Sequence, residues 1–426
     1  MKPSPGDVTG GAPADSGLWL RWMLLFFLAS VFESMGFGHL GAFTPLYLGE
    51  LHVPAAQIPL WTGILGAVGW IVGIPMIPLW GVWAETYSRK FVIARSAYVE
   101  AVLFGLAAWA PNVWVLLVAR FLSGLVVGNT GVMFAMQSDV TPRERLGTAV
   151  AVISAASSVG MAVGPLLGAF VIGALGLRAL LVLDSVLSLA AGLGLTVWLR
   201  DNRTRPAVQG RTGELIIRTV RTIASTEGVP ALFALSFAGT LGVTATASFL
   251  PLLVARLHHG PGLATSIGLV LTVSGVVLAL ATPLWGRIGE RLGYVPALRV
   301  ATAALALTMA AQAVAPSLLA LGLARAVQAA FQGGIGALTT TLLALRVPAD
   351  RRAAVLNFSL LPMQLSWFLG PLVGAAAASV NLRAAWWAGF VPCVAAFFIA
   401  GIAAGQTGRP HGGMPAGAPM EAVQGG

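Results

Sequence analysis

The chain has 426 residues, of which 57% are hydrophobic and only 9% are charged. A water-soluble protein of this length could not bury so many apolar side chains, so the composition excludes that class and predicts an all-α membrane protein. The formal net charge of +10 would suit a nucleic-acid-binding protein, but the cations gather in the connections between apolar runs, so no nucleic-acid partner is needed to explain them.

Apolar runs of about 20 residues, the length a helix needs to cross a bilayer, recur along the chain. Residues 1–18 and 405–426 are polar, and we expect disordered tails there. The longest polar connection, residues 200–228, separates residues 19–199 from residues 229–404. Its apolar residues predict a short amphipathic helix, with a plain solvated linker as the alternative. Twelve spans are predicted, beginning near Trp19, Ile58, Phe91, Val113, Arg145, Ala179, Val229, Leu263, Val295, Ser317, Arg351 and Ala384.

The basic residues are distributed unequally between the two sides of the predicted bundle. Twenty of the 25 Lys and Arg residues lie in the tails or in connections on the same side as the tails. Because cytoplasmic connections are enriched in basic residues, both termini are expected in the cytoplasm. The remaining five lie on the other side or inside spans: Arg178, Arg256 and Arg383, and Arg120 and Arg325.

A few ionisable residues fall inside the first six spans, where each costs roughly 2.5–3.5 kcal/mol or more and needs a partner or a function. Glu33, near the middle of the first span, is our candidate proton carrier, with a permanent ion pair to an arginine as the alternative. His39 titrates in the useful range, or else donates a hydrogen bond to a neighbouring helix. Arg120 is a further ionisable residue, in the fourth span. Glu100 and Asp184 are interpreted as hydrogen-bonding residues between helices.

A short polar connection joins the second span to the third. Gly81 allows close packing at the end of the second span, and Glu85 places an acid four residues later. Arg89 and Lys90 then keep the connection out of the lipid. The phrase Pro-Leu-Trp-Gly that opens this connection returns 205 residues later, so the chain is a duplication. The second copy contains the corresponding polar residues Gly286, Glu290 and Arg291.

The fifth span contains small residues at a spacing of four, Gly160, Gly164 and Gly168. This spacing makes a flat ridge on which another helix can pack closely. Pro165 removes one backbone donor and allows a bend. The eleventh span has a weaker form of the same pattern.

The second half repeats the first as six further spans, and Arg325 in the tenth span corresponds to Arg120. Gln328 and Gln332 follow Arg325 at i+3 and i+7, a polar stripe that a water-filled cavity or a polar ligand would satisfy. With Phe37 of the first span, these residues are our candidates for the substrate cavity. Because each half has an even number of spans, the halves are parallel repeats, and a substrate would lie at mid-depth between them.

The two polar loops resemble the signature loop of the major facilitator superfamily, Gly-x-x-x-acid-basic-x-Gly-basic-basic. The first copy departs from it with Glu85 for the usual Asp, Thr86 for a basic residue and Ser88 for the second Gly, and the second copy lacks the later basic residues. Arg120 with Gly124 resembles the family's fourth-helix motif, which is assigned to proton coupling. The Gly ridge with Pro165 resembles the fifth-helix motif of the drug:proton antiporter branch.

This resemblance implies the major facilitator fold, in which spans 1, 4, 7 and 10 line the central cavity. It places Glu33, Arg120 and Arg325 there, and His39 less firmly. It also implies gates on the side of the termini. Glu85 would lie near Arg351 and Arg352 at the start of the eleventh span, and Glu290 would lie near Arg143 or Arg145 at the start of the fifth.

The resemblance also implies the function: secondary active transport by alternating access and, through the antiporter branch, proton-coupled export of small hydrophobic or amphipathic molecules. Import or facilitated uptake of a metabolite is the alternative within transport, and a non-transporting sensor or a membrane-embedded enzyme is the alternative outside it. The single cysteine, Cys393, excludes an intramolecular disulfide and a thiolate metal cluster. We expect no enzyme activity, no cofactor and no metal. The expected partners are a small-molecule substrate, protons and membrane lipid, and we expect a monomer in a bacterial inner membrane.

Overall fold

The computed structural model describes residues 17–200 and 212–405. The two expected tails lie outside these ranges, apart from residues 17–18 and 405, and so does part of the central connection. Within the described ranges, twelve helices are long and apolar enough to cross a membrane, and no residue is in a strand. The prediction of an all-α membrane protein with twelve spans is confirmed.

Three spans consist of more than one helix: the fourth in the first half, and the seventh and the eleventh in the second half. The helices of the first half are α1 (Leu18–Glu50), α2 (Ile58–Thr86), α3 (Arg89–Ala108), α4 (Val113–Leu122), α5 (Thr130–Val140), α6 (Arg143–Leu175) and α7 (Leu177–Trp198), with short 3-10 helices η1 (Ala55–Gln57) and η2 (Ser123–Leu125). The helices of the second half are α9 (Val229–Ala247), α10 (Leu250–Leu257), α11 (Leu263–Leu292), α12 (Tyr294–Ala313), α13 (Leu318–Arg346), α14 (Ala349–Phe358), α15 (Leu360–Val380) and α16 (Ala384–Gly405).

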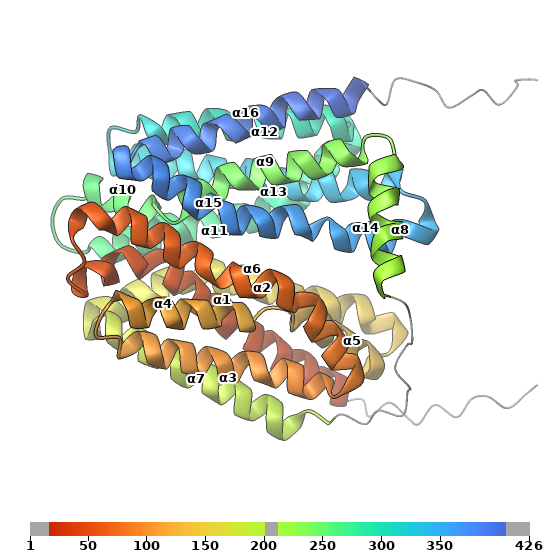
Figure 1. Cartoon of the computed structure of the whole chain (residues 1–426), viewed down its shortest axis with the longest axis horizontal. Coiled ribbons are helices and arrows are strands. Elements are labelled where there is room, and N and C mark those ends of the chain that lie inside the picture. The colour runs from red at the N-terminus through yellow and green to blue at the C-terminus, as the bar shows by residue number, and fades with distance from the viewer. Residues whose placement is uncertain (1–16, 201–211, 406–426) are drawn as a thin grey trace, which may run out of the picture.

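The two halves form two bundles that lie side by side (Figure 1). The described ends of the chain and the connecting helix α8 (Thr212–Ser225) lie at one end of both bundles, which we call the termini side. The other end is called the opposite side. In α8, Thr219 and Thr222 are buried, and Thr222 accepts a hydrogen bond from Arg351 of α14. The central connection therefore contains a helix that packs on the second half.

Tight turns between spans are set by capping groups. In the first polar loop, the side chain of Ser88 accepts a hydrogen bond from the backbone N–H of Phe91 and begins α3. The corresponding residue of the second loop, Gly293, has a φ of +86°, a conformation that favours glycine, and separates α11 from α12. Ser88, which replaces the usual glycine of the family pattern, thus ends its loop with a side-chain cap, whereas the second loop ends with a glycine of positive φ.

The halves touch through small residues on two helix pairs, α6 with α11 and α2 with α15. A Cβ atom added to Gly275 of α11 would lie 2.8 Å from the Cα atom of Ala162 of α6. A Cβ added to Gly66 of α2 would lie 3.0 Å from the Cβ of Pro371 of α15. Small side chains allow this approach, which supplies van der Waals contact in place of the hydrophobic effect that is missing within a membrane.

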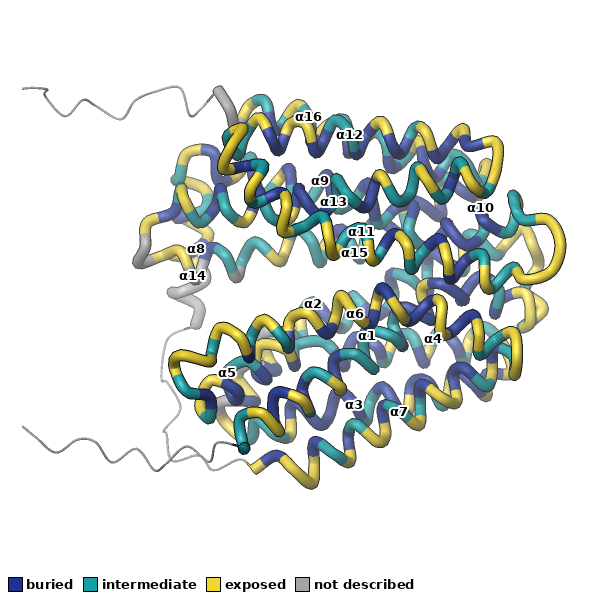
Figure 2. Tube along the Cα trace, turned by 180° about the vertical axis from the view of Figure 1, so that it is seen from behind, coloured by how far each residue is buried: buried dark blue, intermediate teal, exposed yellow. Residues whose placement is uncertain are grey.

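These contacts lie in the parts of the spans toward the opposite side, and the traces of the two halves diverge toward the termini side (Figure 2). Side chains at the helix ends of the termini side are exposed: Tyr87 by 75% and Leu292 by 63%. The halves are therefore joined near the opposite side and separate near the termini.

Candidate functional site

The fourth span is broken in its middle, which the hydrophobic pattern did not predict. After α4 and η2 the chain leaves the helix and re-enters it only at Thr130. Gly128 in this break has a φ of +97°, and a Cβ atom there would also lie 3.1 Å from the Trp80 ring. The left-handed conformation and the close approach of Trp80 both require glycine. A break in the helical hydrogen-bond pattern inside a membrane leaves backbone carbonyls that must find other donors.

Arg95 of α3 supplies those donors. Its Nη2 atom donates to the carbonyl oxygens of Val126 at 3.1 Å and Val127 at 3.3 Å. The guanidinium lies over the Trp80 ring, 3.5 Å from its centre, and Arg95 is only 9% exposed. Arg95 is one of the twenty basic residues that were predicted in the tails or in connections on the termini side; that prediction is wrong for Arg95, because its side chain is buried inside the first half.

Glu33 lies beside this break. The side-chain amide of Asn129 donates to Oε2 of Glu33 at 2.6 Å and to the hydroxyl of Ser96 at 2.9 Å. Glu33 and Arg95 attract each other electrostatically. Asn129 is buried, at 2% exposure, whereas Glu33 is partly exposed. The break thus brings a carboxyl group of α1, an arginine of α3 and the amide of Asn129 together.

His39 and Asp184 form a second buried pair, between α1 and α7. The Nδ1 atom of His39 lies 3.0 and 2.9 Å from the two carboxylate oxygens of Asp184, and Nε2 lies 2.8 Å from the carbonyl oxygen of Gly164 on α6. A carbonyl oxygen can only accept, so Nε2 bears a proton and one further proton lies between Nδ1 and the carboxylate. His39 is 2% exposed and Asp184 is 3% exposed. This pair joins three helices and is sealed from solvent.

Arg120 is not part of the Glu33 cluster. Its Nε atom donates to the backbone carbonyl of Leu65 at 3.0 Å, so Arg120 links α4 to α2. The two helices are close at this point, where a Cβ atom on Gly69 of α2 would lie 3.0 Å from the carbonyl oxygen of Arg120. No hydrogen bond joins Arg120 to Glu33 among the described residues. Its expected role in proton coupling stays a prediction.

Gln328, in the polar stripe of the tenth span, lies inside the bundle of the second half. Gln328 accepts hydrogen bonds from Nη1 of Arg325 at 2.7 Å and from the amide of Gln312 at 2.8 Å. Gln312 in turn accepts from the indole of Trp386 at 3.2 Å, and both glutamines are fully buried. In this conformation Gln328 therefore supports Arg325 from inside the bundle and does not line a cavity between the halves. Gln312 of α12 belongs to this network and was not among the predicted residues.

The other candidates for the substrate cavity, Arg325, Gln332 and Phe37, are partly exposed. Phe37 lies one turn after Glu33 on the same face of α1. These three residues remain available to a substrate, and their role in binding it stays a prediction.

The glycine ridge of the fifth span packs on α1. A Cβ atom on Gly160 would lie 2.6 Å from the carbonyl oxygen of Val31, and one on Gly168 would lie 2.6 Å from the His39 ring. A Cβ atom on Gly164 would lie 3.1 Å from the Cα atom of Met35. Since α6 also contacts α11 through Ala162, this helix lies between α1 of its own half and a helix of the other half.

On α2 and α15 the contact between the halves ends in a pair of aromatic rings. The ring centres of Trp70 and Trp367 are 4.8 Å apart, with 40° between their planes. The position that corresponds to Trp70 in the second half is Gly275, at the repeat distance of 205 residues. Equivalent positions of the repeat therefore hold a large aromatic side chain at the α2–α15 crossing and a glycine at the α6–α11 crossing.

The polar loops lie apart from one another. Arg89 forms an ion pair with Asp139 at the end of α5, at 2.6 Å, and Lys90 lies in the first turn of α3. Gly81 and Glu85 lie near the end of α2, but their side chains are outside the described part of the structure, as is the expected contact of Glu85 with Arg351. In the second half Gly286 lies near the end of α11, and Glu290 and Arg291 are exposed; Arg145 of α6 in the first half is exposed too. None of these three charged side chains forms an ion pair among the described residues.

Comparison with known proteins agrees with this architecture. A sequence model described as Major Facilitator Superfamily matches residues 26–266 and 232–413. The Multidrug resistance protein MdtG of Citrobacter koseri is 26% identical over 381 residues, 88% of this chain and 92% of that protein. The protein of the same name from Klebsiella pneumoniae is 26% identical over 376 residues, 86% of this chain and 89% of that protein.

Two solved structures have the same arrangement of helices. A bacterial homologue of the human lysosomal transporter Spinster, in an inward-facing and unoccupied conformation, has a TM-score of 0.74 at 16% identity, covering 93% of this chain and 98% of that one. The nucleoside transporter NupG has a TM-score of 0.72 at 15% identity, covering 92% of this chain and 100% of that one. These likenesses show the two-repeat fold that the sequence predicted. The chain is therefore a multi-pass membrane transporter, not an enzyme, and it belongs to the major facilitator superfamily.

Proposed function

We propose that this protein exports small hydrophobic or amphipathic molecules in exchange for protons, by alternating access of its two halves. Residues 19–199 and 229–404 would be the two moving units, working within a monomer, and residues 200–228 would connect them. The relatives from Citrobacter koseri and Klebsiella pneumoniae bear the name Multidrug resistance protein, which supports export as the direction and an apolar substrate class.

The exposure of Glu33 is the observation on which proton coupling depends most. Of the three carboxyl groups well inside the described spans, Glu100 and Asp184 are buried, at 2% and 3% exposure, and only Glu33 is partly exposed. A proton carrier must exchange protons with water in at least one state, and Glu33 alone meets that condition here. A charged carboxylate is costly in an apolar environment, so covering Glu33 favours its protonated form.

Protonation of Glu33 would affect the structure through the cluster at the break of the fourth span. Deprotonated Glu33 is attracted to Arg95, and Arg95 in turn satisfies the two carbonyls of the break. Protonation removes that attraction while the hydrogen bond from Asn129 can remain. The charge on α1 is thereby linked to the position of the fourth span, as coupling requires. His39 and Asp184, which are sealed, would instead hold α1 against α6 and α7.

The proposed orientation determines which side of the membrane the diverging ends of the two halves face. With both termini in the cytoplasm of a bacterial cell, as the basic residues favour, the diverging ends of the halves face inward. The exposed Arg145, Glu290 and Arg291, with Gly81, Glu85, Arg89, Lys90, Gly286 and Arg351 in the same loops, would form the gate when that side closes. Arg325, Gln332, Phe37 and Arg120 would be reached by a substrate entering between the halves.

Transport into inside-out vesicles tests both the coupling and the direction. Their lumen corresponds to the cell exterior, so an acid-inside proton gradient should drive accumulation of a fluorescent lipophilic cation in exchange for protons that leave. A protonophore added during the assay should abolish that accumulation. If accumulation instead required right-side-out vesicles with acid outside, the protein would be an importer. Uptake that ignored the proton gradient in both orientations would show a facilitator.

A further inference from the structure

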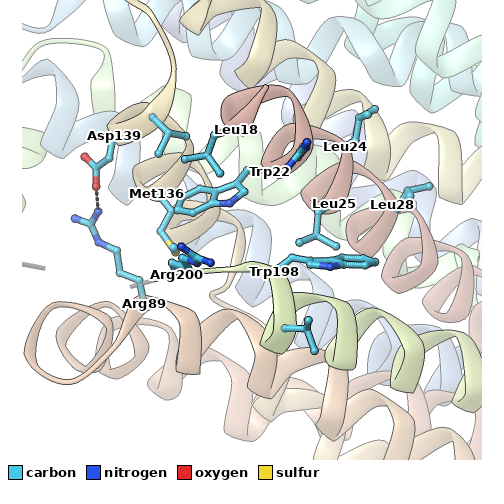
Figure 3. A pocket seen from close by; sticks show the side chains of 13 residues that line it. Leu18, Trp22, Leu24, Leu25, Leu28, Arg89, Met136, Asp139, Trp198 and Arg200 are labelled. Atoms are coloured by element: carbon cyan, nitrogen blue, oxygen red, sulfur yellow. Dashed lines mark hydrogen bonds and ion pairs between the residues drawn. The ribbon is translucent and has the colours of Figure 1, made fainter. Parts of the chain in front are cut away.

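A pocket of about 960 Å³ opens on the termini side of the first half, away from the Glu33 cluster. It lies between the first turns of α1, the start of α3, the end of α5 and the end of α7 (Figure 3). None of its lining residues belongs to the second half. The pocket is therefore a feature of one bundle and does not depend on how the halves are placed.

One wall of this pocket is an apolar stripe that is open to the outside. On α1, Leu24 and Leu28 stand one turn apart and are each 49% exposed. On α7, Val197 is 70% exposed and Trp198 is 67% exposed. In a protein that spans a membrane such side chains face lipid, and an indole at the end of a span lies at the level of the headgroups. The pocket is accordingly a groove in which an acyl chain can lie.

Cations stand at the end of the same stripe. Arg21 lies one turn before Leu24 and Leu25 on α1, and Arg200 follows the end of α7; both are exposed lining residues. The one acid in the lining, Asp139, forms an ion pair with Arg89. The side chains of Arg21 and Arg200 have no hydrogen bond or ion pair among the described residues. Two positive charges that have no partner in the described part of the chain thus stand where apolar surface meets the membrane boundary.

We propose that this groove binds one anionic phospholipid of the leaflet on the termini side. The phosphate lies between Arg21 and Arg200, and one acyl chain follows Leu24 and Leu28. A free anion would leave the apolar wall without a partner, whereas an uncharged apolar ligand would leave the two arginines without one. A phospholipid satisfies both features, since basic residues near a membrane surface attract anionic headgroups. The lipid would then join the ends of the first and sixth spans.

Native mass spectrometry of the full-length protein tests this proposal. The protein is titrated with dioleoylphosphatidylglycerol, with dioleoylphosphatidylcholine and with inorganic phosphate. We expect saturable binding of one phosphatidylglycerol, weakened at least about tenfold in the double variant Arg21→Gln/Arg200→Gln. The matched control is Arg218→Gln/Arg221→Gln, which removes the same charge from exposed positions on α8 of the same side and should bind like the wild type.

Three outcomes would overturn the proposal. Equal affinity for phosphatidylcholine would show that charge does not select the ligand. Displacement of the lipid by millimolar phosphate would show a free-anion site. An equal loss in the α8 control would show general surface attraction. A second readout, the rise in melting temperature on adding phosphatidylglycerol, should disappear in the Arg21→Gln/Arg200→Gln variant and persist in the control.

Discussion

His39 on α1 donates a hydrogen bond from Nε2 to the carbonyl oxygen of Gly164 on α6, at 2.8 Å. The acceptor belongs to the glycine ridge itself, and the other ring nitrogen of His39 faces Asp184 on α7. One side chain therefore sets the contact of α1 with two other helices. A histidine held on both nitrogens and 2% exposed is suited to fixing the position of α1.

The variants His39→Leu and Asp184→Leu should each destabilise the protein, because removing one partner of a buried charged pair costs about 3–5 kcal/mol. The double variant should be more stable than the sum of the two losses predicts, because no unpaired group remains. Melting temperatures of the purified proteins measure this. Asp139→Leu is the control: its ion pair with Arg89 is exposed and should contribute less than about 1 kcal/mol. Additive losses would show that the pair does not act as a unit.

Glu33→Gln should abolish uphill transport driven by protons and leave exchange of substrate across the membrane intact. A glutamine can still accept the hydrogen bond from Asn129, but it cannot bind and release a proton. Proteoliposomes assayed for accumulation and for counterflow separate the two activities. Glu100→Gln, at a buried carboxyl group bonded to Ser188, is the matched control and should retain coupling. A Glu33→Gln protein that still concentrates substrate would move the coupling site elsewhere.

Gly128→Ala should lower stability by about 1–3 kcal/mol, the cost of a non-glycine residue in an unfavourable backbone conformation, and should also impair coupling. The added methyl group meets Trp80 as well, and the break would have to shift. The control is Gly131→Ala, three residues later in α5, where an added Cβ meets nothing within 4 Å. Melting temperature and uphill transport are measured for both. If the two substitutions behave alike, the break does not depend on Gly128.

Gly164→Leu should inactivate or uncouple transport by at least about tenfold, because a side chain on the ridge must separate α6 from α1. Gly173→Leu adds the same side chain to the same helix, at a position where a Cβ atom meets nothing within 4 Å, and should be mild. Initial transport rates at equal protein content compare the two. Equal losses would mean that the ridge has no special part in the mechanism.

The pair Ala162→Cys/Gly275→Cys, in a Cys393→Ala background, should form a disulfide between the halves on mild oxidation. A Cβ on Gly275 would lie 3.0 Å from the Cβ of Ala162, close to the separation of about 3.5–4.5 Å that a disulfide needs. The oxidised protein should stop transport, and reduction should restore it. Transport that continues with the cross-link in place would contradict alternating access. The single variants are the controls.

The number and order of the spans could be predicted because a membrane imposes a length and an apolar composition on each of them. The repeat was visible because Gly, Pro and Arg recur at one offset. Glu33 could be singled out for the same reason, since a carboxyl group is rare at that depth. These features depend on the identity and the spacing of single residues, which the sequence shows directly.

The surroundings of Glu33 could not be predicted in this way. The break at Gly128 lies within a run that remains apolar on average, and glycine is common in membrane helices. Arg95 was predicted on the termini side with the other basic residues, and the carbonyls of the break, which its side chain satisfies, explain its burial. The partners of His39 lie 125 and 145 residues away along the chain, a relationship that helical periodicity does not contain.

The two crossings between the halves differ in a way that bears on the path of motion. At Gly275 and Ala162 the backbones nearly touch, whereas at Trp70 and Trp367 two indole rings fill the corresponding space. Alternating access requires both crossings to part. Helices in backbone contact can separate without rearranging any side chain, whereas paired rings must first slide past each other. We therefore expect the α6–α11 crossing to open by direct separation of the two helices, and the α2–α15 crossing to open only after the tryptophan rings have moved.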